Sequence, residues 1–173
     1  MSDVIALRQA ATDRYRPDPV KVLFVAESPP DVEERHFYFP NVPRADTLWV
    51  ELTKVLYGDD FGVTKNERVR KAEWLARFQA DGYWMIEAVP EPIHKKRREA
   101  HVLEYKDRVL GTIADCSPSS VVLIATPVWR ALEEPLRAEG VPLVQTGPVS
   151  FPGHGQQGRF REAMAAILPL LVD

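Results

Sequence analysis

The segment Val22 to Val25, with the residues that follow it, constrains this chain more than any other feature. Its four consecutive apolar side chains are typical of a strand that is buried on both faces of a parallel sheet. Glu27 follows directly, and Pro29-Pro30 prevents a strand or helix from continuing. Ligands of open parallel α/β sheets bind at the carboxyl ends of the strands, so Glu27 is expected at the mouth of a site. The alternative is a strand-end glutamate that only faces water.

Size and composition indicate a soluble intracellular protein. The 173 residues predict a single domain, spanning residues 1–173, that needs no covalent staples. One cysteine, Cys116, excludes an internal disulfide and any four-cysteine zinc or iron–sulfur site. The chain shows neither the apolar core of a signal peptide nor a run long enough to span a membrane, which predicts a cytoplasmic location. A net charge of −3 argues against non-specific coating of nucleic acid but allows a local basic patch.

Strand-like and helix-like segments alternate along the chain. Further strands are predicted at Tyr83–Ile86, Val121–Ala125 and Pro142–Gln145. Helices are expected over residues 3–15, 46–57, 64–82, 98–116, 126–140 and 159–171. This order implies right-handed crossovers and an α/β fold, a three-layer α/β/α sandwich with a central four-stranded parallel sheet. The polar residues after each strand would then meet at one edge of the sheet.

The segment from Ser28 to Ala45 is long, rich in proline and irregular. It contains the aromatic cluster His36-Phe37-Tyr38-Phe39. Loops of this length in compact domains are usually functional or disordered, and the aromatic residues favour function. We therefore expect a lid or the wall of a pocket, although these rings could simply anchor the loop to the core.

Several common chemistries lack their motifs. No glycine-rich phosphate loop follows any predicted strand, and there is no G-x-S-x-G elbow. The four histidines have no tight metal-ligand spacing. The sequence therefore predicts no cofactor and no metal.

The remaining motifs resemble those of the uracil-DNA glycosylase superfamily. They are A-E-S-P-P at residues 26–30, aromatic residues about a dozen positions later, Asn41, and Leu48-Trp49 on a helix. The first motif is most similar to the G-E-A-P-G type, and the order of elements agrees from about residue 20 to residue 170. The resemblance implies a fold of that type and hydrolysis of the bond that joins a damaged or deaminated base to DNA.

The resemblance also assigns roles to individual residues. Glu27 corresponds to the position whose loop orients the attacking water, and Phe39, or alternatively Phe37 or Tyr38, to the ring that stacks on the base. Ser28, Tyr38 and Asn41 would contribute to the base pocket. Glu87 falls where many members keep an asparagine that reads the base edge. His154 lies in the loop that carries the leaving-group histidine.

Four departures from the family pattern matter. Ala26 replaces a glycine, and the cysteines of an iron–sulfur cluster are missing, which removes that cofactor. The direct counterpart of the family histidine is Pro148, Val149 or Ser150, with His154 further on. Ionised Glu87 would only accept hydrogen bonds, which disfavours uracil and suits a base with two adjacent donors, such as a guanine-type base. A protonated Glu87, if burial raised its pKa, could restore the original pattern.

The expected partner is single- or double-stranded DNA carrying a damaged base, bound by a monomer. Phosphate contacts are expected from the basic run and a nearby serine, namely Lys95, Lys96, Arg97, Arg98 and Ser150. The basic run could equally be a solvated helix start. Two alternatives to a DNA glycosylase stay open: a protein of the same fold that binds a nucleobase, nucleotide or nucleic acid without cleavage, and a hydrolase of small nucleosides.

Overall fold

The computed structural model describes residues 3–58, 64–94 and 96–171 and has a small parallel sheet at its centre. Its strand order is β2 (Tyr83–Glu87), β1 (Val22–Ala26), β3 (Ser120–Leu123). Val22 is the register partner of both Tyr83 and Ser120, so all three strands point the same way. Every residue of β1 is buried. The α/β class and the central position of the first strand are confirmed.

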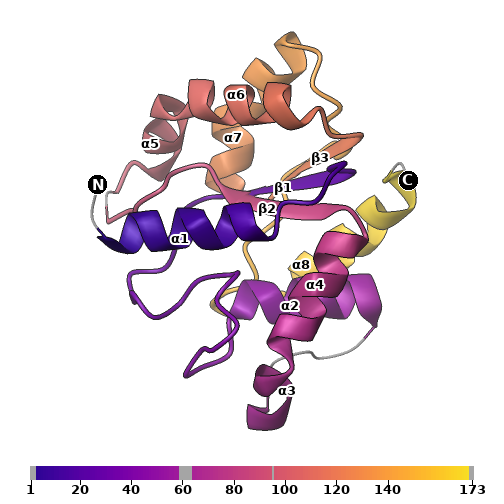
Figure 1. Cartoon of the computed structure of the whole chain (residues 1–173). Helices are drawn as coiled ribbons and strands as arrows, with labels where there is room; N and C mark the ends of the chain where they lie inside the picture. Colours follow the sequence, from indigo (N-terminus) through magenta and orange to yellow (C-terminus); the bar gives the residue numbers. More distant parts are fainter. Residues whose placement is uncertain (1–2, 59–63, 95, 172–173) are drawn as a thin grey trace.

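Helices cover both faces of the sheet (Figure 1). The elements α5, α6 and α7 lie on one face, while α2, α4 and α8 lie on the other. Their bounds are α1 (Asp3–Arg14), α2 (Thr47–Tyr57), α3 (Lys65–Val69), α4 (Lys71–Ala80), α5 (Arg98–Glu104), α6 (Lys106–Cys116), α7 (Thr126–Ala138), α8 (Gln157–Ile167) and the 3₁₀ turn η1 (Leu168–Leu170). Among the described residues, no helix combines the length and the apolarity that crossing a membrane requires.

Local capping signals set several helix starts. The Asp46 carboxylate accepts from the Trp49 N–H at 2.9 Å at the start of α2. Thr64 and Glu67 form a reciprocal capping box at α3. The predicted helix over 64–82 is nevertheless two helices that meet at Arg70, and the one over 98–116 is two that meet at Tyr105. Neither junction contains glycine or proline, so the sequence gives no local signal for the break.

The predicted fourth strand at Pro142–Gln145 is not present in the described sheet. This segment makes only an isolated bridge, between Leu143 and Val121. At Leu123 the Gln145 side chain replaces the backbone of a neighbouring strand. Its Oε1 accepts from the Leu123 N–H at 2.5 Å, and its Nε2 donates to the Leu123 carbonyl at 2.9 Å. A side-chain amide thus satisfies the β3 backbone groups that a neighbouring strand would have paired.

The long segment after β1 contains no helix or strand and is held by side chains from elsewhere in the fold. Buried Arg8 of α1 donates to the carbonyls of Pro30, Val32 and Arg35 at 2.9, 2.8 and 3.2 Å. Buried Lys71 of α4 donates to the His36 carbonyl at 3.4 Å. These bonds satisfy backbone groups that have no secondary-structure partner, and they fix the path of the segment.

Candidate functional site

A cavity of about 900 Å³ lies at the carboxyl edge of the sheet. Its walls come from the loop after β1, the end of β2, the turn after β3, the start of α2 and the loop before α8. This is where an open parallel sheet is expected to bind a ligand. The residues assigned from the sequence that line it are Glu27, Ser28, Glu87, Arg98, Ser150 and His154.

Glu27 is buried at the end of β1 and forms an ion pair with Arg98. Arg98 Nε donates to Oε1 at 2.5 Å, and Nη2 donates to Oε2 at 2.9 Å. This two-pronged geometry is the strong form of an arginine–carboxylate contact. Half of the Arg98 side chain remains exposed, 49% by area, at the start of α5. An ionised carboxylate has about four lone-pair sites, so Glu27 can still accept from a water molecule or a ligand.

Glu87 ends β2 and reaches the cavity with 15% of its side chain exposed. His36 lies beneath it with no exposed side-chain area, and its Nε2 is 3.1 Å from Glu87 Oε1. This is a close contact and not a hydrogen bond, since neither ring nitrogen of His36 has a hydrogen-bond partner in the part of the chain that the structure describes. Arg108 of α6 donates to the Glu87 carbonyl at 2.7 Å.

The charges around Glu87 decide its ionisation. Burial by itself would raise the pKa of Glu87, but His36, the backbone and Arg108 together hold that pKa below its usual value. Glu87 is therefore ionised at neutral pH. Of the two states considered from the sequence, the structure supports the carboxylate that only accepts hydrogen bonds.

Glu27 and Glu87 line the same cavity but do not occupy paired positions. Ala26 is the register partner of Glu87, and Glu27 lies one residue beyond the end of β1. Each carboxylate accordingly has its own basic partner, Arg98 for Glu27 and His36 for Glu87. The arrangement differs from a pair of carboxylates that share one proton.

The aromatic residues of the loop have different positions. Phe37 lines the cavity and is 3% exposed, with its ring packed against Trp49 and Phe78. Tyr38 is 1% exposed, and its hydroxyl accepts from the Met85 N–H at 2.6 Å, so it belongs to the core. Phe39 contacts His36 and is not among the cavity-lining residues, and neither is the exposed Asn41. Phe37, one of the two alternatives to Phe39 named from the sequence, is thus the aromatic of this cluster that lines the cavity.

The loop before α8 forms the outer wall. Ser150 and the exposed His154 line the cavity, and His154 has a backbone φ of 49° that directs the chain sharply. Phe151 lines it too and is 44% exposed, which leaves an accessible ring at the cavity mouth. Arg159 adds a positive charge nearby.

The basic run is divided between two hollows. Arg98 lines the cavity, while Lys96 and Arg97, together with Arg98, line an adjoining groove of about 660 Å³ between α5 and α7. Arg130 of α7 adds a further positive charge there, and Glu99 and Glu134 add negative ones. Lys95 lies outside the described residues. Arg98 and Pro127 line both hollows, so the groove and the cavity are neighbours.

Three residues near the site were not assigned from the sequence. Arg8 shapes the loop, His36 supports Glu87, and Phe151 stands at the mouth. His36 carried a signal that could have found it, since a histidine inside an aromatic run must pair with a polar group when the run is buried. No group of three or more His, Cys, Asp or Glu side chains within the described ranges is placed to hold a metal ion.

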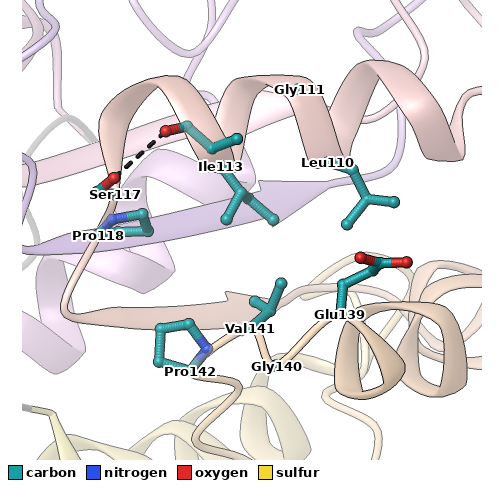
Figure 2. Close-up of a pocket in the computed structure, with 10 residues that line it drawn as sticks. Leu110, Gly111, Ile113, Ser117, Pro118, Glu139, Gly140, Val141 and Pro142 are labelled. Atoms are coloured by element: carbon teal, nitrogen blue, oxygen red, sulfur yellow. Dashed lines mark hydrogen bonds between the residues drawn. The ribbon is translucent and has the colours of Figure 1, made fainter.

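A second cavity, of about 580 Å³, lies at the other end of β3 (Figure 2). Leu110 and Ile113 of α6 face Val141 and Pro142 across it. Among the described residues that line it, Glu139 is the one with an ionisable side chain. This hollow therefore lacks the convergent polar groups of the cavity at the carboxyl edge.

Comparison with protein-family models, curated proteins and solved structures finds no match to this chain.

Proposed function

We propose that this protein hydrolyses the N-glycosidic bond of a damaged or deaminated base in DNA. The observation that carries the proposal is the meeting of Glu27, Glu87, Phe37 and His154 in one cavity at the carboxyl edge of the sheet. The resemblance of the same segments to the uracil-DNA glycosylase superfamily gives these residues a common purpose. A fold of that superfamily's type, without iron–sulfur cysteines, is part of the proposal.

Hydrolysis of the N-glycosidic bond requires stabilisation of two opposite charges. Breaking the bond leaves positive charge on the sugar and negative charge on the departing base. Glu27 would orient a water molecule and stabilise the sugar, and Arg98 holds this carboxylate in a fixed direction. His154 would donate to the departing base. Phe37 offers an apolar wall for the base, and Glu87 offers acceptors to its edge.

The phosphates of the DNA strand that carries the base need positively charged side chains nearby. The groove between α5 and α7 provides Lys96, Arg97 and Arg130, and Arg98 lines both this groove and the cavity. Arginine and lysine contacts to phosphate position a strand without reading its sequence. A flipped base would enter the cavity while the flanking phosphates lie in the groove. The proposal includes a cytoplasmic monomer that acts without a cofactor.

The test is a panel of oligonucleotides that carry uracil, hypoxanthine, xanthine or other lesions, followed by alkaline scission of abasic sites. The Glu27→Gln variant should lose about 10²- to 10⁴-fold in excision rate, the usual contribution of a group that moves or orients a proton. Glu51→Gln is the matched control, because Glu51 is also a buried carboxylate paired with an arginine, Arg161, outside the cavity. No excision of any lesion, or equal loss in both variants, would contradict the proposal.

A second candidate is a protein that binds a nucleobase or nucleoside in the same cavity, without cleavage of DNA or with hydrolysis of the free nucleoside. Two observations favour it: Arg98 contacts both oxygens of Glu27, and the net charge is −3. Tight binding of nucleosides, with no DNA binding even at low salt, would select this candidate.

A further inference from the structure

Among the described acids that line the cavity, Glu87 is the one in contact with a buried histidine. His36 Nε2 lies 3.1 Å from its Oε1, and the buried His36 ring packs against Tyr38 and Phe39. Among the side chains that the structure describes, none is seen to donate to Oε2. The Glu87 backbone also contributes a hydrogen bond to this carboxylate. An ionised carboxylate has about four lone-pair sites, so it can still accept from a ligand.

The position of Glu87 restricts what that ligand can be. Glu87 is the last residue of β2, whose register with β1 fixes its place, and the apolar Phe37 lines the same cavity. The N–H groups of a planar heterocycle lie in the plane of the ring, so a carboxylate that accepts from them meets the edge of the ring and not its face. The hydrogen-bonding pattern of that edge then decides which ring binds.

We propose that Glu87, positioned by His36, makes the cavity selective for a heterocycle whose edge presents two adjacent N–H donors, the pattern of a guanine-type base. The inference rests on the proposed function in one respect, that the cavity accepts a nucleobase. His36 is a positioning residue, since it contacts the carboxylate and not the ligand.

The donor pattern distinguishes the common bases. Guanine offers an imino N–H beside an amino N–H, so both can donate to the two oxygens of one carboxylate. Hypoxanthine keeps the imino donor but has no amino group. Uracil places a carbonyl on each side of its N–H, and these oxygens would face the negative charge. Affinity should therefore fall in the order guanine, hypoxanthine, uracil.

The first measurement uses the unmodified protein and four soluble probes, 9-methylguanine, 1,9-dimethylguanine, 9-methylhypoxanthine and 1-methyluracil, titrated by calorimetry or NMR. A hydrogen bond to a charged group contributes enough to predict about 10- to 100-fold weaker binding when either donor of 9-methylguanine is removed. Equal affinity for 9-methylguanine and 1,9-dimethylguanine would overturn the inference, and so would a preference for 1-methyluracil. This result does not depend on whether a variant folds.

The second measurement uses Glu87→Gln, whose amide both donates and accepts. It should weaken 9-methylguanine by at least about tenfold and strengthen 1-methyluracil relative to it. Glu51→Gln, with its carboxylate outside the cavity, should leave both affinities unchanged. An unaltered order of the probes in a folded Glu87→Gln variant would contradict the inference.

The third measurement isolates His36. The groups that act on Glu87 are His36 from the loop, Tyr38 beside it, Arg8 of α1 and Arg108 of α6. Removing His36 leaves burial, which raises the pKa of Glu87, with less opposition. In His36→Gln, binding of 9-methylguanine should therefore be lost at a higher pH than in the unmodified protein as the pH falls.

A matched control for this profile is His101→Gln. His101 is also a buried histidine, its Nδ1 lies 2.9 Å from Glu104, and it lies outside the cavity. An unshifted pH profile in His36→Gln, or an equal shift in His101→Gln, would remove the positioning role.

These assays separate the inference from the proposed function. Selective binding of 9-methylguanine that depends on Glu87, with no excision from any oligonucleotide, would support the inference and contradict the glycosylase. Excision at an unchanged rate and with unchanged base preference in Glu87→Gln would support the glycosylase and contradict the inference.

Discussion

The Tyr38→Phe substitution tests whether Tyr38 belongs to the core and not to the base pocket. Tyr38 is 1% exposed, and its ring stacks on Tyr15 with centroids 5.6 Å apart. Its hydroxyl accepts from the Met85 N–H at 2.6 Å, on the side of β2 that has no neighbouring strand in the described sheet. Phenylalanine keeps the stacking but removes the acceptor. The buried Met85 N–H would then have no partner.

The expected loss of stability follows from that single orphaned donor. Leaving a buried donor unsatisfied costs about 1–3 kcal/mol of unfolding free energy. For a chain of this length, each kcal/mol lowers the melting temperature by about 2–4 °C, so we expect a fall of roughly 2–12 °C. Affinity and activity per folded molecule should stay unchanged, because the Tyr38 hydroxyl does not reach the cavity.

Urea and thermal unfolding, followed by circular dichroism, measure this difference. The control is Tyr105→Phe: the Tyr105 hydroxyl donates to Glu91 at 2.6 Å in a part of the surface where water can replace it. That change should cost less than about 1 kcal/mol. Equal stability of the two variants would refute the reasoning. A loss of ligand affinity with no loss of stability would instead support the assignment of Tyr38 to the base pocket.

Two further predictions concern Lys71 and Phe151. Burial lowers the pKa of Lys71 to about 8, so between about pH 8 and about pH 9.5 the unfolded chain binds a proton that the folded chain has released. The unfolding free energy should rise by up to about 2 kcal/mol over that range. Lys71→Met should abolish the rise in urea titrations, and an identical slope in both proteins would contradict the assignment. If Phe151 stacks on a base, Phe151→Ala should weaken DNA binding by roughly 5- to 150-fold without loss of stability. DNA binding is measured by fluorescence anisotropy. The control is Leu170→Ala, which removes a similarly exposed apolar side chain and should leave DNA affinity unchanged. Equal DNA affinities of the Phe151→Ala and Leu170→Ala variants would exclude the stacking role.

The parts of the fold that were predicted from the sequence depend on local signals. The run at Val22–Val25 could only be a buried strand, and its carboxyl end placed Glu27 at the cavity. Asp46 and the Thr64–Glu67 pair mark helix starts through their own side-chain contacts. Repetition of the strand-then-acid pattern at Glu87 placed a second carboxylate at the same edge. Each of these features is encoded within a few consecutive residues.

The features that the sequence could not predict depend on residues far apart in the chain. Gln145 follows a segment with strand-like composition, yet its side chain, and not its backbone, pairs with Leu123. The choice among the loop aromatics depended on where Tyr38 finds its partner, which is a backbone group of β2. The contact between His36 and Glu87 joins segments far apart in the chain. Periodicity and spacing carry no information about such contacts.

Arg8 lets α1 help to shape the cavity, although α1 itself does not line it. One nitrogen of its guanidinium holds three carbonyls of the loop after β1, and that loop supplies Ser28, Arg35 and Phe37 to the wall. A shortened protein that began at β1 would keep the three strands of the sheet but lose these three hydrogen bonds to the loop. Trimming experiments should therefore treat α1 as part of the binding apparatus, and an engineered fusion at the amino end should leave α1 free to dock.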